Sequence, residues 1–366
     1  MANINDYLIW RGDISISDEF PLNEVDNMIL ARISYLRFDL INIKDNETLF
    51  DCAERMKNVE EKDFLYTGDS ELIRNLGESK RFSSIRLTDY VNENEKESEK
   101  QFAAVTIHIL PDTLFISYMG TDSTINGWKE DFNMAFMDSV PCQIAGKEYL
   151  EMIANKYPDK KLMLAGHSKG GCVAIYAAVT VNDYIKKRIV SVTNYDGPGF
   201  SNSMIEKYYD ADIISRTNTI IPQDSVIGRV LEHKERTSVC LSIEKGIYQH
   251  DIYSWQIVRD KPVKLERNTN KSEIITDTLS VWLEKTTSEQ RKLFVDIVFE
   301  LIYNTDAEHF SQISKSPASS IPKIIKKYNE IESGDRRIIF EMVKVFIKSY
   351  IEVFREKDLR IEPKNV

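Results

Sequence analysis

The chain has few cysteines and few histidines, and this scarcity limits the kinds of site that it can form. Only four cysteines occur among its 366 residues, and no two of them have C-x-x-C spacing: Cys52, Cys142, Cys172 and Cys240. Zinc sites and disulfide frameworks need cysteines at closer, recurring intervals. We therefore expect neither a metal nor a disulfide, and we interpret the cysteines as reduced, mostly buried residues.

The sequence also lacks long apolar runs and an excess of positive charge. No apolar run approaches the length of a membrane span, and the N-terminus lacks the basic start and apolar core of a signal peptide. A net charge of −10 disfavours nucleic acid or an anionic membrane surface as the main partner, although local basic patches stay possible. These features predict a soluble, cytoplasmic globular protein without a transmembrane segment.

One glycine-bounded serine is the strongest chemical signal in the chain. Gly166-His167-Ser168-Lys169-Gly170 fits the G-x-S-x-G pattern, in which a sharp strand-to-helix turn exposes a nucleophilic serine. An apolar strand pattern at 161–165 precedes it and an apolar helix pattern at 169–181 follows it, so the required order is present. The plainer alternative is a strand-to-helix turn with an incidental serine.

The periodicity of the chain predicts an α/β fold with a mainly parallel central sheet. Helices at 127–136, 142–156 and 202–209 alternate with strands at 161–165, 188–195 and 212–219, as in βαβ units. Further β patterns are at 237–243 and 253–258. Ahead of them, helical patterns lie between 21 and 80, and a hairpin turns at Pro111-Asp112. The charged segment 92–100 has the composition of a solvated loop.

Past about residue 266 the pattern is purely helical, so we predict an α/β domain at 1–265 and a helical C-terminal appendage at 266–366. Thr287 and Gln290 have the spacing of a capping box, and Gly334 is placed as a helix stop. An apolar stripe on the last helix, from Ile338 to Val353, favours packing of the appendage on the central sheet over a partner or cofactor groove.

A serine nucleophile needs a histidine base and an acid that orients this base. In folds with this serine elbow, the acid and then the histidine follow the nucleophile in the chain. The candidate bases are therefore the three histidines after Ser168, namely His233, His250 and His309. His309 lies within the helical appendage and His233 in a charge-rich stretch, whereas His250 lies between two β patterns. We therefore expect His250 to be the base, with His233 as the alternative.

For the acid we favour Asp224, which lies in a loop just after a strand. Asp196 is the competitor because it also ends a strand, although the glycines and proline after it suit a turn; Asp212 and Asp251 are weaker candidates. The backbone N–H of Lys169 should donate one oxyanion hydrogen bond. The loop at Gly120-Thr121, after the strongest strand, should supply the second.

Three motifs together resemble the class 3 lipases among the α/β-hydrolases, which carry F-R-G-T/S, then W-x-x-D, then G-H-S-L-G-G. Their counterparts here are Tyr118-Met119-Gly120-Thr121, Trp128-Lys129-Glu130-Asp131 and Gly166-His167-Ser168-Lys169-Gly170-Gly171. The resemblance implies an α/β-hydrolase fold with Thr121 as the oxyanion threonine, and it supports Ser168, Asp224 and His250 as the triad. The chain is still more similar to an uncharacterised bacterial family of lipase-like proteins, a domain of unknown function, through 6–13, 21–26, 166–171 and 196–200.

Two departures from the better-known lipases concern the elbow and the oxyanion loop. Met119 replaces an arginine and Lys169 replaces a leucine. We expect the Lys169 side chain to reach solvent from the helix N-terminus; a positive charge beside the acyl oxygen is the alternative.

The leading hypothesis is a serine hydrolase that cleaves a small acyl ester or a lipid through an acyl-enzyme, without a cofactor or metal. A non-catalytic binding or scaffold protein, and an acyltransferase or thioesterase with the same triad, are the alternatives. The sequence does not predict an oligomeric state.

Overall fold

The computed structural model describes residues 2–266, 270–305, 307–309, 312–313 and 317–358. Its central feature is a nine-stranded sheet of order β1-β2-β3-β4-β5-β6-β7-β8-β11. The strands are β1 (Glu47–Thr48), β2 (Arg86–Glu95), β3 (Lys100–Leu110), β4 (Thr113–Tyr118), β5 (Lys161–His167), β6 (Ile189–Tyr195), β7 (Thr217–Pro222), β8 (Arg236–Cys240) and β11 (Lys264–Leu265), and β9 (Ile257–Val258) pairs with β10 (Lys261–Pro262) in a separate ribbon. Strands β4 to β8 run parallel, and the strands at both edges are antiparallel.

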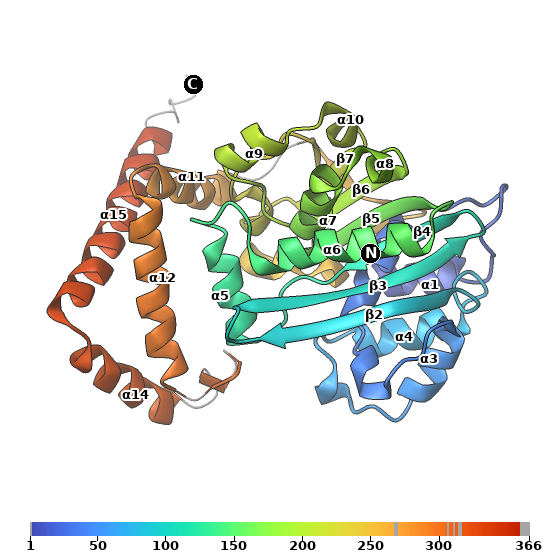
Figure 1. Ribbon diagram of the computed structural model, residues 1–366, viewed down its shortest axis with the longest axis horizontal. Coiled ribbons are helices and arrows are strands. Elements are labelled where there is room, and N and C mark those ends of the chain that lie inside the picture. The colour runs from blue at the N-terminus through green and yellow to red at the C-terminus, as the bar shows by residue number, and fades with distance from the viewer. Residues whose placement is uncertain (1, 267–269, 306, 310–311, 314–316, 359–366) are drawn as a thin grey trace, which may run out of the picture.

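Helices cover both faces of the sheet (Figure 1). They are α1 (Ile4–Arg11), α2 (Glu24–Arg32), α3 (Leu49–Met56), α4 (Asp69–Glu78), α5 (Ile125–Asn133), α6 (Pro141–Lys156), α7 (Lys169–Thr180), α8 (Asp183–Lys186), α9 (Asn202–Tyr208) and α10 (Ala211–Ser215). Successive side chains of a strand point to opposite faces. Phe115 accordingly joins the core beneath α1 to α4, whereas Leu114 and Ile116 join the core beneath α6 and α7. This arrangement is the α/β-hydrolase fold, as the sequence predicts.

Among the described residues, the C-terminal appendage contains the helices α11 (Asn270–Glu284), α12 (Ser288–Tyr303), α14 (Pro317–Glu330) and α15 (Ser333–Asp358). They stand at one side of the molecule, next to α5 (Figure 1). Helix α12 packs on α5, where the Phe132 and Phe299 rings are 5.7 Å apart. The Ile125 N–H also donates to the carbonyl of Glu308, in the segment after α12. The appendage therefore packs on α5, and the prediction that it packs on the sheet is wrong.

The predicted helix cap and hairpin turn are confirmed, because hydrogen bonds between residues close in the chain determine both. The capping box of Thr287 and Gln290 begins α12, and β3 and β4 form the hairpin around Pro111-Asp112. Gly334, however, lies in the first turn of α15 and ends no helix. Residues 253–256 are not a strand, because β9 holds only Ile257 and Val258.

Two segments differ from their predicted structure. In 92–100, β2 and β3 continue as a hairpin, and Lys100 Nζ pairs with Glu93 and Glu95 at 3.0 and 2.8 Å. Ion pairs between strands thus replace the expected solvated loop. The strand predicted at 212–219 is shorter than expected. Asp210 is the N-cap of α10, which occupies Ala211–Ser215, so β7 begins only at Thr217.

Candidate active site

Ser168 lies on a strained turn between the end of β5 and the start of α7. Its backbone φ is 58° and ψ is −135°, a conformation that L-residues rarely adopt, and the residue is buried at the base of a cavity. The flanking glycines allow this turn to form. A Cβ on Gly166 would lie 2.2 Å from the Gly170 carbonyl carbon, and a Cβ on Gly170 would lie 2.2 Å from the Tyr118 oxygen. The local geometry is that of a nucleophile elbow.

His250 and Asp196 form a close pair beside this elbow. His250 Nδ1 is 2.6 Å from Asp196 Oδ2, and the carboxylate is almost fully buried. Asp196 directly follows β6 and has a φ of 53°, and its other oxygen accepts a hydrogen bond from the Ser225 hydroxyl. A carboxylate in this position holds the proton of the imidazole on Nδ1 and leaves Nε2 as a base.

Asp224 does not make the contact with His250 that the sequence predicted. Its Oδ2 accepts a hydrogen bond of 2.6 Å from Gln249 Nε2, and its N–H donates to Gln249 Oε1. The physical reason is strand order: β6 is the immediate neighbour of β5, and Tyr195 is in register with His167, so Asp196 emerges next to Ser168. Asp224 follows β7, one strand farther away, and fixes the loop that carries His250.

Ser168 and His250 both line the same cavity. Among the described residues, no hydrogen bond joins Ser168 Oγ to the His250 ring. Catalytic hydrogen bonds are often long in the absence of substrate and shorten when it binds. The arrangement therefore has a strained serine and an oriented histidine that face a common space.

His167 contacts His250, the proposed base, through its ring and its Nε2 atom. The centroid of its ring lies 4.5 Å from that of the His250 ring, with the two planes tilted by 32°, and its Nε2 is 2.7 Å from the His250 carbonyl oxygen. Burial, followed by the nearby His250 and Arg32, holds the pKa of His167 well below its usual range, so the ring is neutral. Its single proton then lies on Nε2. The Tyr35 hydroxyl donates to the His167 carbonyl oxygen at 3.0 Å and lies 3.2 Å from Nδ1.

The two remaining histidine candidates lie elsewhere. His233 Nδ1 is 2.6 Å from Glu235 Oε1, in a pair that is largely shielded from solvent, so its segment is less exposed than its charges suggested. His309 Nδ1 is 2.9 Å from Ser123 Oγ and joins the appendage to the loop after Thr121. In the part of the chain that the structure describes, no three His, Cys, Asp or Glu residues are grouped to hold a metal ion.

The backbone around the elbow supplies candidate oxyanion donors. Lys169 is the first residue of α7, where an N–H has no partner within the helix. In the facing loop the Gly120 N–H already donates to the Tyr35 hydroxyl, and the Thr121 hydroxyl donates to Asp131 Oδ2 at 2.6 Å. The backbone N–H is thus the group that Thr121 can present to an oxyanion. Burial raises the pKa of Asp131 to about 6.

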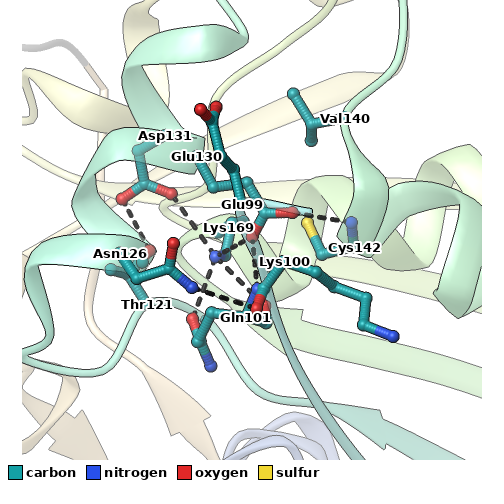
Figure 2. Close-up of polar contacts among 12 residues, drawn as sticks. Glu99, Lys100, Gln101, Thr121, Asn126, Glu130, Asp131, Val140, Cys142 and Lys169 are labelled. Carbon is teal, nitrogen blue, oxygen red and sulfur yellow. Dashed lines mark hydrogen bonds and ion pairs between the residues drawn. The ribbon is translucent and has the colours of Figure 1, made fainter. Parts of the chain in front are cut away.

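The Lys169 side chain turns away from solvent, contrary to our expectation. Its Nζ lies 2.7 Å from Glu130 Oε2 and 2.9 Å from Gln101 Oε1, and both members of the ion pair are almost completely buried (Figure 2). Glu130 also accepts the backbone N–H groups of Gln101 and Cys142 at 3.1 and 2.7 Å. Although burial alone would lower it, the Glu130 carboxylate raises the pKa of Lys169, so the ammonium group stays charged. This ion pair joins α5 to the elbow.

Replacing Lys169 by methionine should destabilise the protein by about 3–5 kcal/mol, because Glu130 would remain as an uncompensated buried charge. Urea unfolding of the variant measures this loss. The combined Lys169→Met and Glu130→Gln variant should recover much of it, and Lys161→Met, at an exposed position, should have little effect. A loss below about 1 kcal/mol for Lys169→Met would contradict the role given to this ion pair.

A cavity of about 700 Å³ opens above Ser168 and His250, and its walls are mainly apolar. The hydrolase-fold part contributes Trp128, Phe132, Met134 and Val226, among others. The opposite wall comes from the appendage, with Leu279, Trp282 and Leu283 of α11, Phe294 and Val295 of α12, and Met342, Val343 and Phe346 of α15. The C-terminal helices thus complete the candidate site, a role that the sequence did not reveal.

A protein-family model matches residues 76–300, which is more than half of the chain. The chain belongs to the Mbeg1-like family. The Mbeg1-like region contains Ser168, Asp196 and His250, and it continues through α11 into α12. The family match therefore does not end at residue 265, where the sequence pattern placed a domain boundary.

The fold is also similar to several solved structures, among which are fungal lipases. Lipase II from Rhizopus niveus is 12% identical, with 58% of this chain and 77% of that chain covered and a TM-score of 0.39. A variant of MDLA from Penicillium cyclopium is 13% identical, with 71% and 92% covered and a TM-score of 0.40. The native Rhizomucor miehei lipase–propeptide complex is 10% identical, with 67% of this chain and 82% of that chain covered and a TM-score of 0.39. A search of curated proteins by sequence found no match.

Proposed function

We propose that this Mbeg1-like protein hydrolyses carboxylic esters through an acyl-enzyme on Ser168. His250 is the base and Asp196 the residue that orients it, and the backbone N–H groups of Lys169 and Thr121 bind the oxyanion. The observation that carries the proposal is the Asp196–His250 pair beside a strained serine, with both Ser168 and His250 facing one cavity. This proposal replaces Asp224 with Asp196 in the acid role.

The chemistry follows from these positions. His250 Nε2 removes the Ser168 proton as Oγ attacks the ester carbonyl, and Asp196 stabilises the imidazolium that forms. The two N–H groups stabilise the negative oxygen of the tetrahedral intermediate. His250 then protonates the leaving alcohol. Water, activated by the same histidine, hydrolyses the acyl-enzyme and regenerates Ser168.

The cavity supports an ester with an apolar acyl group. Its volume of about 700 Å³ suits a small-molecule or lipid ligand, and aromatic and aliphatic side chains form most of its walls. Such walls provide few hydrogen-bond or ion-pair partners for a charged or sugar-like substrate. The four cysteines are free and buried, which is compatible with a reducing compartment such as the cytoplasm. An acyltransferase or thioesterase would use the same residues with another acceptor or leaving group.

Turnover of p-nitrophenyl esters of short, medium and long acyl chains tests this proposal. We expect hydrolysis that a fluorophosphonate abolishes, with a preference for the longer apolar chains that the cavity can hold. Hydrolysis that survives complete fluorophosphonate treatment would contradict the acyl-enzyme mechanism. Failure to cleave any ester or thioester of the panel would favour a non-catalytic binding role.

A further inference from the structure

Helix α15 has an apolar face that the rest of the protein does not cover. One side of the helix packs on α11 and α12, where Met342, Ser349 and Val353 are buried. The adjoining side leaves seven large apolar residues substantially exposed, namely Phe340, Val343, Phe346, Ile347, Tyr350, Ile351 and Phe354. We call these seven residues the α15 apolar face. Phe340 is 64% exposed and Ile347 is 52% exposed.

The width of the α15 apolar face favours binding to a lipid surface over packing against a single partner helix. At about 100° per residue its seven side chains span an arc of about 140°. A two-stranded coiled coil needs only a narrow seam of alternating three- and four-residue spacing. An arc of this width, several turns long, is typical of a helix that lies in the plane of a lipid interface.

Basic residues along one edge of the α15 apolar face also favour a lipid surface. Arg337, Lys344, Lys348 and Arg355 all follow the edge marked by Ile351, within about 60° of it around the helix axis. Lysine and arginine side chains beside an apolar face can extend to lipid headgroups while their stems stay in apolar surroundings. The chain as a whole carries −10, so this basic edge is a local feature.

The α15 apolar face is continuous with the candidate active site. Val343 and Phe346 belong to the face and also line the cavity that contains Ser168 and His250. Helix α15 packs against α11, where Trp282 Nε1 donates to the Met342 carbonyl at 3.1 Å. An acyl chain that leaves a lipid surface along α15 would thus meet apolar side chains all the way to the cavity.

We propose that α15 docks the protein on a lipid surface that carries anionic headgroups, and that this surface presents the acyl substrate to the cavity. The docking step stands on the α15 apolar face and its basic edge. The delivery step rests on the proposed ester hydrolysis. Among the described residues no helix is long and apolar enough to cross a membrane.

Vesicle co-sedimentation of the full chain tests the docking step, with phosphatidylcholine vesicles and with vesicles that also contain phosphatidylglycerol. Phe340→Ser combined with Ile347→Ser should lower the apparent affinity for both about tenfold or more. These positions avoid the cavity lining. Lys344→Gln combined with Lys348→Gln should weaken binding mainly to the anionic vesicles, and added salt should reduce this difference. Ile9→Ser, at an exposed position of α1 on the opposite side of the molecule (Figure 1), is the matched control.

The outcomes separate docking from catalysis. The Phe340/Ile347 variant should still hydrolyse a short soluble ester, whereas Ser168→Ala should lose hydrolysis and still bind vesicles. Equal vesicle binding by the wild type and the Phe340/Ile347 variant would overturn the docking proposal. So would a wild-type dimer in light scattering that this variant dissociates, without vesicle binding, because a second copy would then cover the α15 apolar face. Vesicle binding without any esterase activity would refute only the proposed function.

Discussion

Replacing Ser168 by alanine should lower kcat for ester hydrolysis by roughly 10⁶-fold, which leaves only the small residual rate that substrate binding and the oxyanion donors provide. The loss is large because the proposed mechanism forms the acyl-enzyme on Ser168, and the histidine and its acid act only through the serine oxygen. Steady-state rates on a p-nitrophenyl ester measure the effect. The variant should keep its stability, since it loses one hydroxyl that faces the cavity.

Ser203→Ala is a matched control for this substitution. Ser203 is exposed and its hydroxyl donates to Asp138, outside the candidate site, so its removal should leave kcat unchanged. Ser168→Ala with a near-normal rate would mean that another residue carries the chemistry, or that the measured esterase is a contaminant. Thermal unfolding of both variants excludes misfolding as the cause of any loss.

Replacing Asp196 by asparagine should lower kcat by roughly 10⁴-fold. The amide would offer an NH₂ group to His250 Nδ1, so the imidazole proton would move to Nε2 and the ring could no longer accept the proton of Ser168. Because Asp196 is almost completely buried and its other oxygen accepts from Ser225, the asparagine side chain has little freedom to rotate away. The substrate affinity should change much less than the rate.

Asp224→Asn is the matched comparison, because Asp224 follows the next strand and contacts the residue before His250. We expect its kcat to fall by less than about tenfold, since its backbone N–H still binds Gln249 and only the side-chain contact changes. Steady-state kinetics of both variants on one ester decide between the two acids. A larger loss for Asp224→Asn than for Asp196→Asn would restore the assignment that the sequence favoured.

The elbow was predictable because its signals are local. The strand before Ser168, the helix after it and the two glycines all lie within about twenty residues, and each has a short-range physical cause. Asp196 was harder to choose over Asp224, because both follow a strand. The decision depends on which strand lies next to β5 in the sheet, and hydrogen bonding between strands, not spacing along the chain, determines that order.

Two features of the site depend on contacts that no local pattern contains. Lys169 is buried because Glu130, on a separate helix, compensates its charge; the unusual lysine after the serine and the glutamate inside W-x-x-D were the available signals, and only together do they predict an ion pair. The wall from α11, α12 and α15 is more than one hundred residues from Ser168 in the chain. The apolar stripe of α15 predicted packing, and part of that stripe faces the cavity.

Reaction of the purified protein with a fluorophosphonate, followed by peptide mapping in a mass spectrometer, tests the central claim most directly. We predict one phosphonylated residue per chain, on the peptide that contains Ser168, and no labelling of Ser168→Ala. Prior replacement of Asp196 by asparagine should slow the labelling of Ser168 strongly. Equal labelling of the wild type and Ser168→Ala, or a label on another serine, would contradict the nucleophile proposed for this protein.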